Sequence, residues 1–154
     1  MAIPGTDGRK MSKSYGNVID VFLPKKQLKK QVMGIQTDST PLEGVKDPDS
    51  CNVFALYELL ATASQTAEMS NRYRAGNYGY GHAKTALLEL ILEEFSEARD
   101  RFDHFMDHPE EVYAALKQGA DKARPIAKQT LLRVRTKLCL LYTSDAADEM
   151  DGGG

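Results

Sequence analysis

Long apolar runs, a secretory leader and cysteine pairs are all missing from this sequence of 154 residues. No stretch of about 18 or more consecutive apolar residues is present, so a membrane-spanning helix is not expected. No basic segment followed by an apolar stretch opens the chain, so a secretory signal is not expected either. The two cysteines, Cys51 and Cys139, lie far apart without a CxxC pair, which disfavours a disulfide framework and a zinc site. These absences predict a cytoplasmic protein with two reduced thiols, no membrane contact and no metal site.

An excess of basic residues over the whole chain is also missing. The sequence has 20 Lys and Arg against 22 Asp and Glu, a net charge of -2, which is not typical of a dedicated nucleic-acid binder. The charge is nevertheless uneven: residues 1–30 carry a local charge of +5, residues 85–111 one of -7, and residues 117–138 one of +6. This asymmetry indicates an anionic partner near each basic region, or else solvated helix faces.

The start of the chain predicts a loop followed by a helix. Residues 1–20 hold three glycines among polar residues and show no apolar period, which is typical of a mobile loop. Pro24 suits the first turn of a helix that ends near Gly34. Its buried side is predicted to carry Leu28, Val32 and Ile35.

Two further helices are predicted after a polar connection over residues 36–47. Asp47 suits a helix cap and Pro48 the first turn that follows it. An apolar stripe then runs through Val53, Phe54, Leu56, Tyr57 and Leu60. A shorter helix through Met69 and Tyr73 is predicted to stop at Gly76.

The strongest helical period covers residues 83–107, where apolar residues recur at steps of three and four. We expect one long amphipathic helix here, ended by His108 and Pro109. A short helix over residues 110–118 is predicted to reach Gly119, and a last helix to begin at an Asp121 cap with Pro125 in its first turn. The buried side of that last helix is predicted to carry Ala123, Ala127, Thr130, Val134 and Leu138. The pattern as a whole predicts an all-α helical bundle.

The segment that departs most from ordinary loop composition covers residues 4–17. It contains two lysines, two hydroxyls and flanking glycines within a few positions, around the run Lys10, Met11, Ser12, Lys13 and Ser14. Such a loop can wrap a polyphosphate, because ammonium groups neutralise charge while hydroxyls and backbone amides donate hydrogen bonds. It is not a Walker loop, since the pattern GxxxxGK[ST] is absent. From composition alone, a solvated basic loop is the alternative.

The same five residues spell KMSKS, the signature loop of class I aminoacyl-tRNA synthetases. Around and beyond it, several blocks resemble the C-terminal half of bacterial tryptophanyl-tRNA synthetases; they cover residues 4–19, 33–39, 49–54, 79–84 and 119–124. The resemblance extends over roughly residues 3–138. Tyrosyl-tRNA synthetases share the fold but usually vary the signature loop and carry a different C-terminal module, so they rank second.

The resemblance implies an enzyme that activates tryptophan with ATP and Mg²⁺ to tryptophanyl-adenylate and pyrophosphate, and then transfers it to tRNA(Trp). It implies catalytic roles for Lys10 and Lys13, whose ammonium groups would stabilise the charge that builds on the leaving pyrophosphate. Met11, Ser12 and Ser14 would complete the contact with ATP. The full enzyme would be a homodimer.

The helical remainder resembles the domain that contacts the tRNA anticodon region. On a helical wheel Arg124, Lys128 and Arg135 fall within about 40° of one another, so all three can meet one strand of phosphate backbone. A solvated helix flank is the alternative interpretation of these three residues.

The chain also departs from the family pattern. The motif HxGH is absent, since the three histidines are His82, His104 and His108. We therefore expect the Rossmann half to be missing before Met1, and the chain alone to be catalytically inactive. The predicted organisation is a signature loop over residues 1–20, a helical C-terminal domain over residues 21–138, and a disordered, non-native tail over residues 139–154. A non-enzymatic helical module that binds RNA or protein remains the alternative function.

Overall fold

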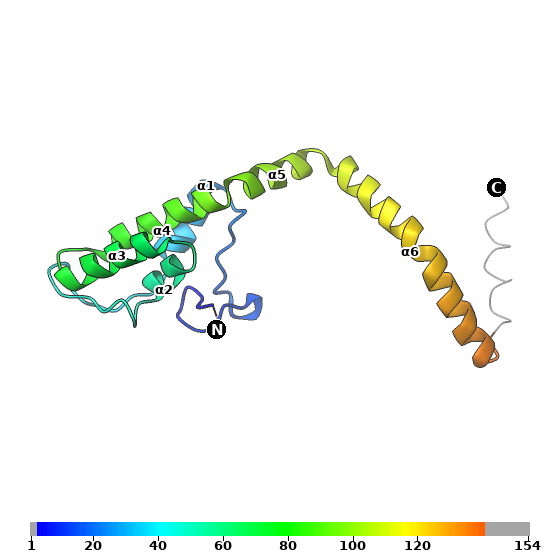
Figure 1. The fold of residues 1–154 in the computed structure, drawn as a ribbon, viewed down its shortest axis with the longest axis horizontal. Helices are drawn as coiled ribbons and strands as arrows, with labels where there is room; N and C mark the ends of the chain where they lie inside the picture. Colours follow the sequence, from blue (N-terminus) through cyan, green and yellow to red (C-terminus); the bar gives the residue numbers. More distant parts are fainter. Residues whose placement is uncertain (1–2, 141–154) are drawn as a thin grey trace. The chain divides into compact units, whose positions relative to one another are not determined.

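The computed structural model describes residues 3–140, and every regular element in that range is helical (Figure 1). In chain order these are the 3₁₀ helix η1 (Lys13–Tyr15) and the α-helices α1 (Lys25–Met33), α2 (Asn52–Glu58), α3 (Ala63–Ala75), α4 (Tyr80–Glu94), α5 (Ser96–Asp107) and α6 (Pro109–Lys137). The predicted all-α class is confirmed. In the described range the chain divides into two units, residues 3–103 and residues 104–140. The predicted domain boundaries after residues 20 and 138 stay predictions.

In the first unit, α1 forms where the sequence predicts it. Pro24 stands just before the helix as its N-cap residue and Gly34 follows its last turn. Leu28 and Val32 are fully buried, and Ile35 just beyond the helix is 2% exposed. The apolar side of α1 packs against α4, while the lysines on its other side stay exposed.

Helix α2 begins later than predicted. Its N-cap is Cys51, and the prediction that Asp47 caps this helix is wrong. The Asp47 carboxylate accepts the Asp49 N–H at 3.1 Å, which closes a local turn in place of a helix cap. Pro48 is buried, and its carbonyl accepts the Cys51 N–H at 3.2 Å. The chain therefore completes one more turn before the helix starts.

Helix α3 has well-defined ends. Thr62 and Gln65 form a capping box at its start, in which the Gln65 N–H donates to the Thr62 hydroxyl oxygen at 3.3 Å. The helix ends at Gly76, as predicted, and this residue has a φ of 76°, which favours glycine. Met69 and Tyr73 provide its buried side.

The predicted long helix over residues 83–107 is wrong in one respect, because it is broken at Phe95. This residue has φ -99° and ψ 13°, outside the helical region, and separates α4 from α5. The Ser96 hydroxyl donates to the Glu93 carbonyl at 2.9 Å and so competes with the backbone ladder at this point. His108 follows α5 and Pro109 begins α6, so the predicted stop at His108 and Pro109 is confirmed.

The core of the first unit is built from α1, α2, α3 and α4: α1 and α2 pack against α4, and α3 packs against α2 (Figure 1). Tyr73 is fully buried, with the rings of Phe54, Tyr78 and Tyr80 at centroid distances of 5.7, 5.8 and 6.0 Å. Its hydroxyl lies 3.5 Å from the Sγ atom of the buried Cys51. Burial raises the pKa of the Tyr73 hydroxyl far above its ordinary value. The aromatic centre therefore stays neutral.

A buried lysine holds the connection between α1 and α2. Lys46 is 2% exposed, and its Nζ donates to the carbonyls of Pro41, Leu42 and Gly44 at 2.8, 3.3 and 3.2 Å. The ammonium also lies 5.3 Å from the centre of the Tyr80 ring. These contacts close residues 41–46 into a compact loop around one positive charge.

In the second unit, α6 runs without interruption over 29 residues. The prediction of two helices separated at Gly119 is therefore wrong, and Pro125 lies inside the helix and not in a first turn. An interior glycine costs a helix about 1 kcal/mol and a proline about 3 kcal/mol, and α6 continues through both of them. The Asp121 carboxylate, predicted as a cap, instead accepts an N–H of Arg124 at 2.9 Å.

The predicted buried side of the last helix is exposed along the described length of α6. Ala123, Ala127, Thr130, Val134 and Leu138 are all exposed, and α6 contributes no buried residue. An apolar period shows which side of a helix can be buried, but burial needs a facing surface.

Within residues 3–140, no helix is both long and apolar enough to cross a membrane. Over the same range, no three His, Cys, Asp or Glu side chains gather as a metal site would need. Cys51 and Cys139 are both free. Most of the predicted disordered tail, residues 141–154, lies outside the described residues.

Candidate functional site

The KMSKS segment belongs to a hydrogen-bonded loop that closes on itself. The Met11 N–H donates to the Ile3 carbonyl at 2.8 Å and the Gly5 N–H to the Arg9 carbonyl at 2.7 Å, which pairs the two sides of the loop. Between them the chain turns at Gly8, whose φ of 80° favours glycine. Residues 3–11 therefore form a narrow hairpin-like loop, with Lys10 on its returning side.

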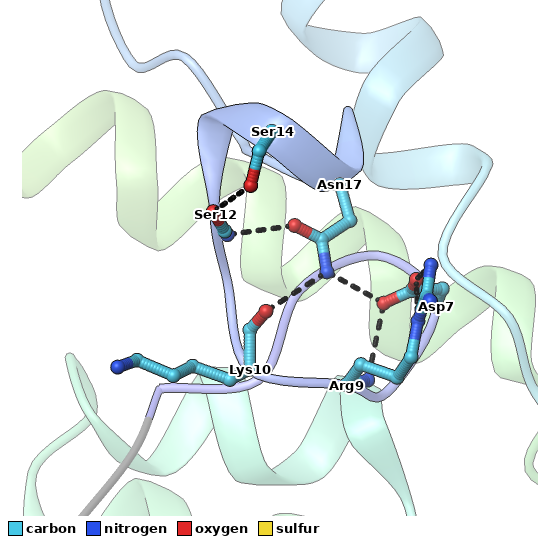
Figure 2. A network of polar contacts seen from close by, with 6 residues as sticks. All are labelled: Asp7, Arg9, Lys10, Ser12, Ser14 and Asn17. Atoms are coloured by element: carbon cyan, nitrogen blue, oxygen red, sulfur yellow. Dashed lines mark hydrogen bonds and ion pairs between the residues drawn. The ribbon is translucent and has the colours of Figure 1, made fainter.

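Asn17 lies at the centre of this loop and is 2% exposed. Its side-chain NH₂ donates to the Asp7 carboxylate at 2.7 Å and to the Lys10 carbonyl at 3.1 Å. Its side-chain oxygen accepts the Ser12 N–H at 2.8 Å. Figure 2 shows these bonds converging on one amide from both arms of the loop. One side chain thus provides a hydrogen-bond partner for three groups of the loop.

Glycine is required where the backbone passes Asn17. A Cβ atom at Gly5 would lie 2.3 Å from the Asn17 nitrogen and 2.4 Å from its Cγ, closer than atoms can approach. Backbone and side chain therefore interlock, because the Thr6 N–H also donates to the Asn17 carbonyl at 2.9 Å.

Asp7 and Arg9 complete the polar frame of the loop (Figure 2). The Asp7 carboxylate accepts the Arg9 N–H at 3.0 Å and the Arg9 Nε–H at 2.7 Å. The guanidinium also lies 4.8 Å from the centre of the Tyr15 ring. The hydrogen bond from Asn17, together with the bonds and charge of Arg9, lowers the pKa of Asp7 below its ordinary value. The Asp7 carboxylate is therefore ionised at neutral pH and available as an acceptor.

The second lysine of the signature lies on the short helix η1. Ser12 precedes η1 in an extended conformation, and its hydroxyl lies 2.8 Å from that of Ser14. Gly16 ends the turn with a φ of 65°. Lys10 and Lys13 are both exposed, and in the described part of the chain neither ammonium forms an ion pair. A fixed backbone thus carries two free positive charges.

The loop is joined to the helical core. The Gln36 N–H, beyond α1, donates to the Thr6 carbonyl at 2.7 Å, and the Asn52 side chain donates to the Gln36 carbonyl at 3.3 Å. An open cavity of about 650 Å³ lies beside η1, and its lining includes Lys13, Gly16 and Gln31 of α1. The space next to the Lys13 side chain is therefore open to a ligand.

The predicted nucleotide-binding residues all lie in the signature loop of the first unit: Lys10, Met11, Ser12, Lys13 and Ser14. The predicted RNA-contacting residues Arg124, Lys128 and Arg135 lie on α6 in the second unit. Of these, Arg124 already pairs with Asp121. The sequence assigned no role to Asn17 or Lys46, because a polar residue in a loop gives no sign of burial.

Comparison with known proteins places this loop in a family. Residues 2–96 match the family model described as tRNA synthetases class I (W and Y). A tryptophan–tRNA ligase from Fusobacterium nucleatum is 47% identical over 133 residues, which cover 86% of this chain and 41% of the relative. One from Campylobacter jejuni strain RM1221 is 44% identical over 138 residues, covering 90% of this chain and 43% of the relative. The chain thus spans about two fifths of the length of these relatives.

The fold agrees with a solved structure of the same kind. The crystal structure of tryptophanyl-tRNA synthetase from Campylobacter jejuni, complexed with ADP and tryptophan, superposes with a TM-score of 0.86 at 43% identity. The match covers 91% of this chain and 44% of that one. The resemblance expected from the KMSKS loop and its flanking blocks is confirmed. Family model, relatives and fold agree: this chain belongs to the class I tRNA synthetases of the tryptophan and tyrosine group.

Proposed function

We propose that this chain supplies the ATP-binding signature loop and the helical C-terminal part of a tryptophan–tRNA ligase. The proposal rests on the loop itself, in which a hydrogen-bonded backbone presents the exposed ammonium groups of Lys10 and Lys13. The identity to tryptophan–tRNA ligases, and the ADP and tryptophan bound by the Campylobacter jejuni relative, support the choice of nucleotide and amino acid.

In the proposed reaction, the tryptophan carboxylate attacks the α-phosphorus of ATP, tryptophanyl-adenylate forms, and pyrophosphate leaves. Negative charge builds on the leaving group in the transition state, and ammonium groups placed there stabilise the transition state more than the bound substrate. Lys10 and Lys13 take this role. The Ser12 and Ser14 hydroxyls and the backbone at Met11 complete the contact with the phosphates, and Mg²⁺ enters with ATP as the counter-ion of its phosphate oxygens.

In the second step the adenylate passes its amino acid to tRNA(Trp). We assign the contact with tRNA backbone to the basic side of α6, through Arg124, Lys128 and Arg135. Arg124 and Lys128 are exposed and Arg135 is partly exposed, so their positive charges are accessible to a phosphate backbone. The complete enzyme works as a homodimer in the cytoplasm, and the chain alone, without the nucleotide-binding half, is inactive.

The deciding experiment is ATP–pyrophosphate exchange. This chain is mixed with the separately expressed nucleotide-binding half of the Campylobacter jejuni relative, and exchange is compared with tryptophan and with tyrosine. Exchange that needs both halves and tryptophan supports the proposal. Exchange with tyrosine favours a tyrosine enzyme. No exchange with either amino acid, while circular dichroism shows a helical chain, contradicts the proposal and favours an RNA-binding module.

The catalytic lysines are tested in the same assay. Lys13→Ala is expected to lower the exchange rate by about tenfold or more, with little change in the KM for tryptophan, because the lost interaction forms only in the transition state. Lys117→Ala on α6, which removes an equally exposed ammonium, is the matched control and is expected to leave exchange unchanged. An unchanged rate for Lys13→Ala removes Lys13 from this role.

A further inference from the structure

We propose that Asn17 is a positioning residue that sets the placement of Lys10 and Lys13 relative to each other. The inference rests on the proposed function, since it concerns the two lysines of the signature loop. Asn17 itself is buried, and its side-chain amide is bonded to Asp7, Lys10 and Ser12 of the loop. It acts through the backbone that carries the two lysines.

The hydrogen bonds of Asn17 fall on both sides of Met11. On one side, the Asn17 NH₂ holds the carbonyl of Lys10 at 3.1 Å. On the other side, the Asn17 oxygen holds the N–H of Ser12, the residue that precedes η1 and with it Lys13, at 2.8 Å. The stretch of backbone between the lysines is therefore fixed at two points by one rigid amide.

Asparagine is the residue type that this position needs. The site offers two acceptors, the Asp7 carboxylate and the Lys10 carbonyl, and one donor, the Ser12 N–H. A side-chain amide has two N–H donors and an acceptor oxygen, so it matches all three groups. Aspartate keeps the acceptor and loses both donors. Alanine loses all three bonds and leaves space beside Gly5.

In the Asn17→Asp variant, the hydrogen bonding at this position is expected to depend on pH. The new carboxylate oxygen would face the Asp7 oxygen at the position where the amide nitrogen now lies, 2.7 Å away. Two carboxylates at this distance cannot both ionise readily, so the pair takes up one proton at a pH above the ordinary value of about 4. The shared proton restores a donor between the two side chains. The charged group that faces this pair is Arg9, which is bonded to Asp7; Lys10 and Lys13 are exposed, and within residues 3–140 neither ammonium pairs with Asp7.

The first measurement uses the 154-residue chain and does not depend on activity. Amide proton chemical shifts are followed by NMR as a function of pH in the wild type, Asn17→Asp and the control Asn71→Asp, an exposed residue on α3. In Asn17→Asp the Ser12 and Gly5 amide signals are expected to move away from wild-type positions at neutral pH and to return as the pH falls. Ser12 and Gly5 signals that stay at wild-type positions at all pH values overturn the proposal.

The second measurement uses the two-half exchange assay. Asn17→Ala is expected to lower kcat by about tenfold to a hundredfold with the KM for ATP changed less than about twofold, since misplaced lysines lose transition-state stabilisation. Asn17→Asp is expected to regain rate, relative to wild type, as the pH is lowered. If the wild type exchanges and both variants are fully active, the positioning role of Asn17 is overturned and the proposed function still stands. A wild type without exchange contradicts the proposed function instead, and the NMR result still decides whether Asn17 fixes the loop.

Discussion

Removal of the buried charge at Lys46 tests how the loop between α1 and α2 is stabilised. Lys46→Met keeps the length and the apolar stem of the side chain and deletes the ammonium that three carbonyls share. A hydrogen bond from a charged group contributes about 1.5–3 kcal/mol. The carbonyls of Pro41 and Leu42 belong to exposed residues, so water can replace part of what is lost. We therefore expect a net loss near that of one such bond, about 2 kcal/mol.

For a unit of about 100 residues, a loss of about 2 kcal/mol lowers Tm by about 8–16 °C. Thermal unfolding followed by far-UV circular dichroism measures this shift. Lys29→Met, on the exposed side of α1, is the matched control and is expected to change Tm by no more than a few degrees. If Lys46→Met and Lys29→Met unfold at the same temperature, the ammonium does not stabilise the loop and the reasoning is wrong.

Three further predictions concern the core, the acid range and RNA binding. Leu28→Ala, at a fully buried position of α1, is expected to lower the free energy of unfolding by about 2–5 kcal/mol in urea titration, against almost no change for the exposed Leu42→Ala. Hydrogen bonds from Thr40, and to a smaller extent from Tyr80, lower the pKa of Asp38. The ionised carboxylate therefore adds to the free energy of unfolding above the ordinary carboxyl pKa, and this contribution is lost as the pH falls through the lowered pKa. Tyr80→Phe is therefore expected to raise the pKa of Asp38 in an NMR titration, and an unchanged pKa would refute the role of the 2.8 Å bond. Replacing Arg124, Lys128 and Arg135 with alanine is expected to weaken tRNA(Trp) binding and to reduce the salt slope by up to about 3, and an unchanged slope in filter binding would remove them from the contact.

The sequence predicts those helices whose ends are set by local chemistry. Helix α1 lies between Pro24 and Gly34 and α3 ends at Gly76, because proline and glycine restrict or permit backbone angles wherever they occur. The break at Phe95 could not be predicted in this way, since it depends on whether the Ser96 hydroxyl bonds to a carbonyl of the preceding turn. Helix α6 shows the opposite error, because a glycine in the middle of a helical segment, such as Gly119, does not by itself end the helix.

The candidate site was predictable in its charges but not in its frame. Lys10 and Lys13 are recognisable from the letters of the signature. Asn17 is not, because its role depends on a bond to Asp7, ten residues earlier, that only the folded loop creates. The burial of Lys46 could not be predicted for the same reason. A lysine in a polar loop is expected to be solvated, and Lys46 is buried because the folded loop turns three carbonyls toward its ammonium.

The interlock of Gly5 with Asn17 restricts how this loop can change over generations. A larger residue at position 5 collides with the Asn17 side chain, while a smaller residue at position 17 removes the bonds that Asn17 makes to the Ser12 amide, the Lys10 carbonyl and the Asp7 carboxylate. Each single replacement is therefore harmful, although a joint replacement could restore a fit. The two positions are therefore coupled by contact, and a redesign of the loop would need to vary them together.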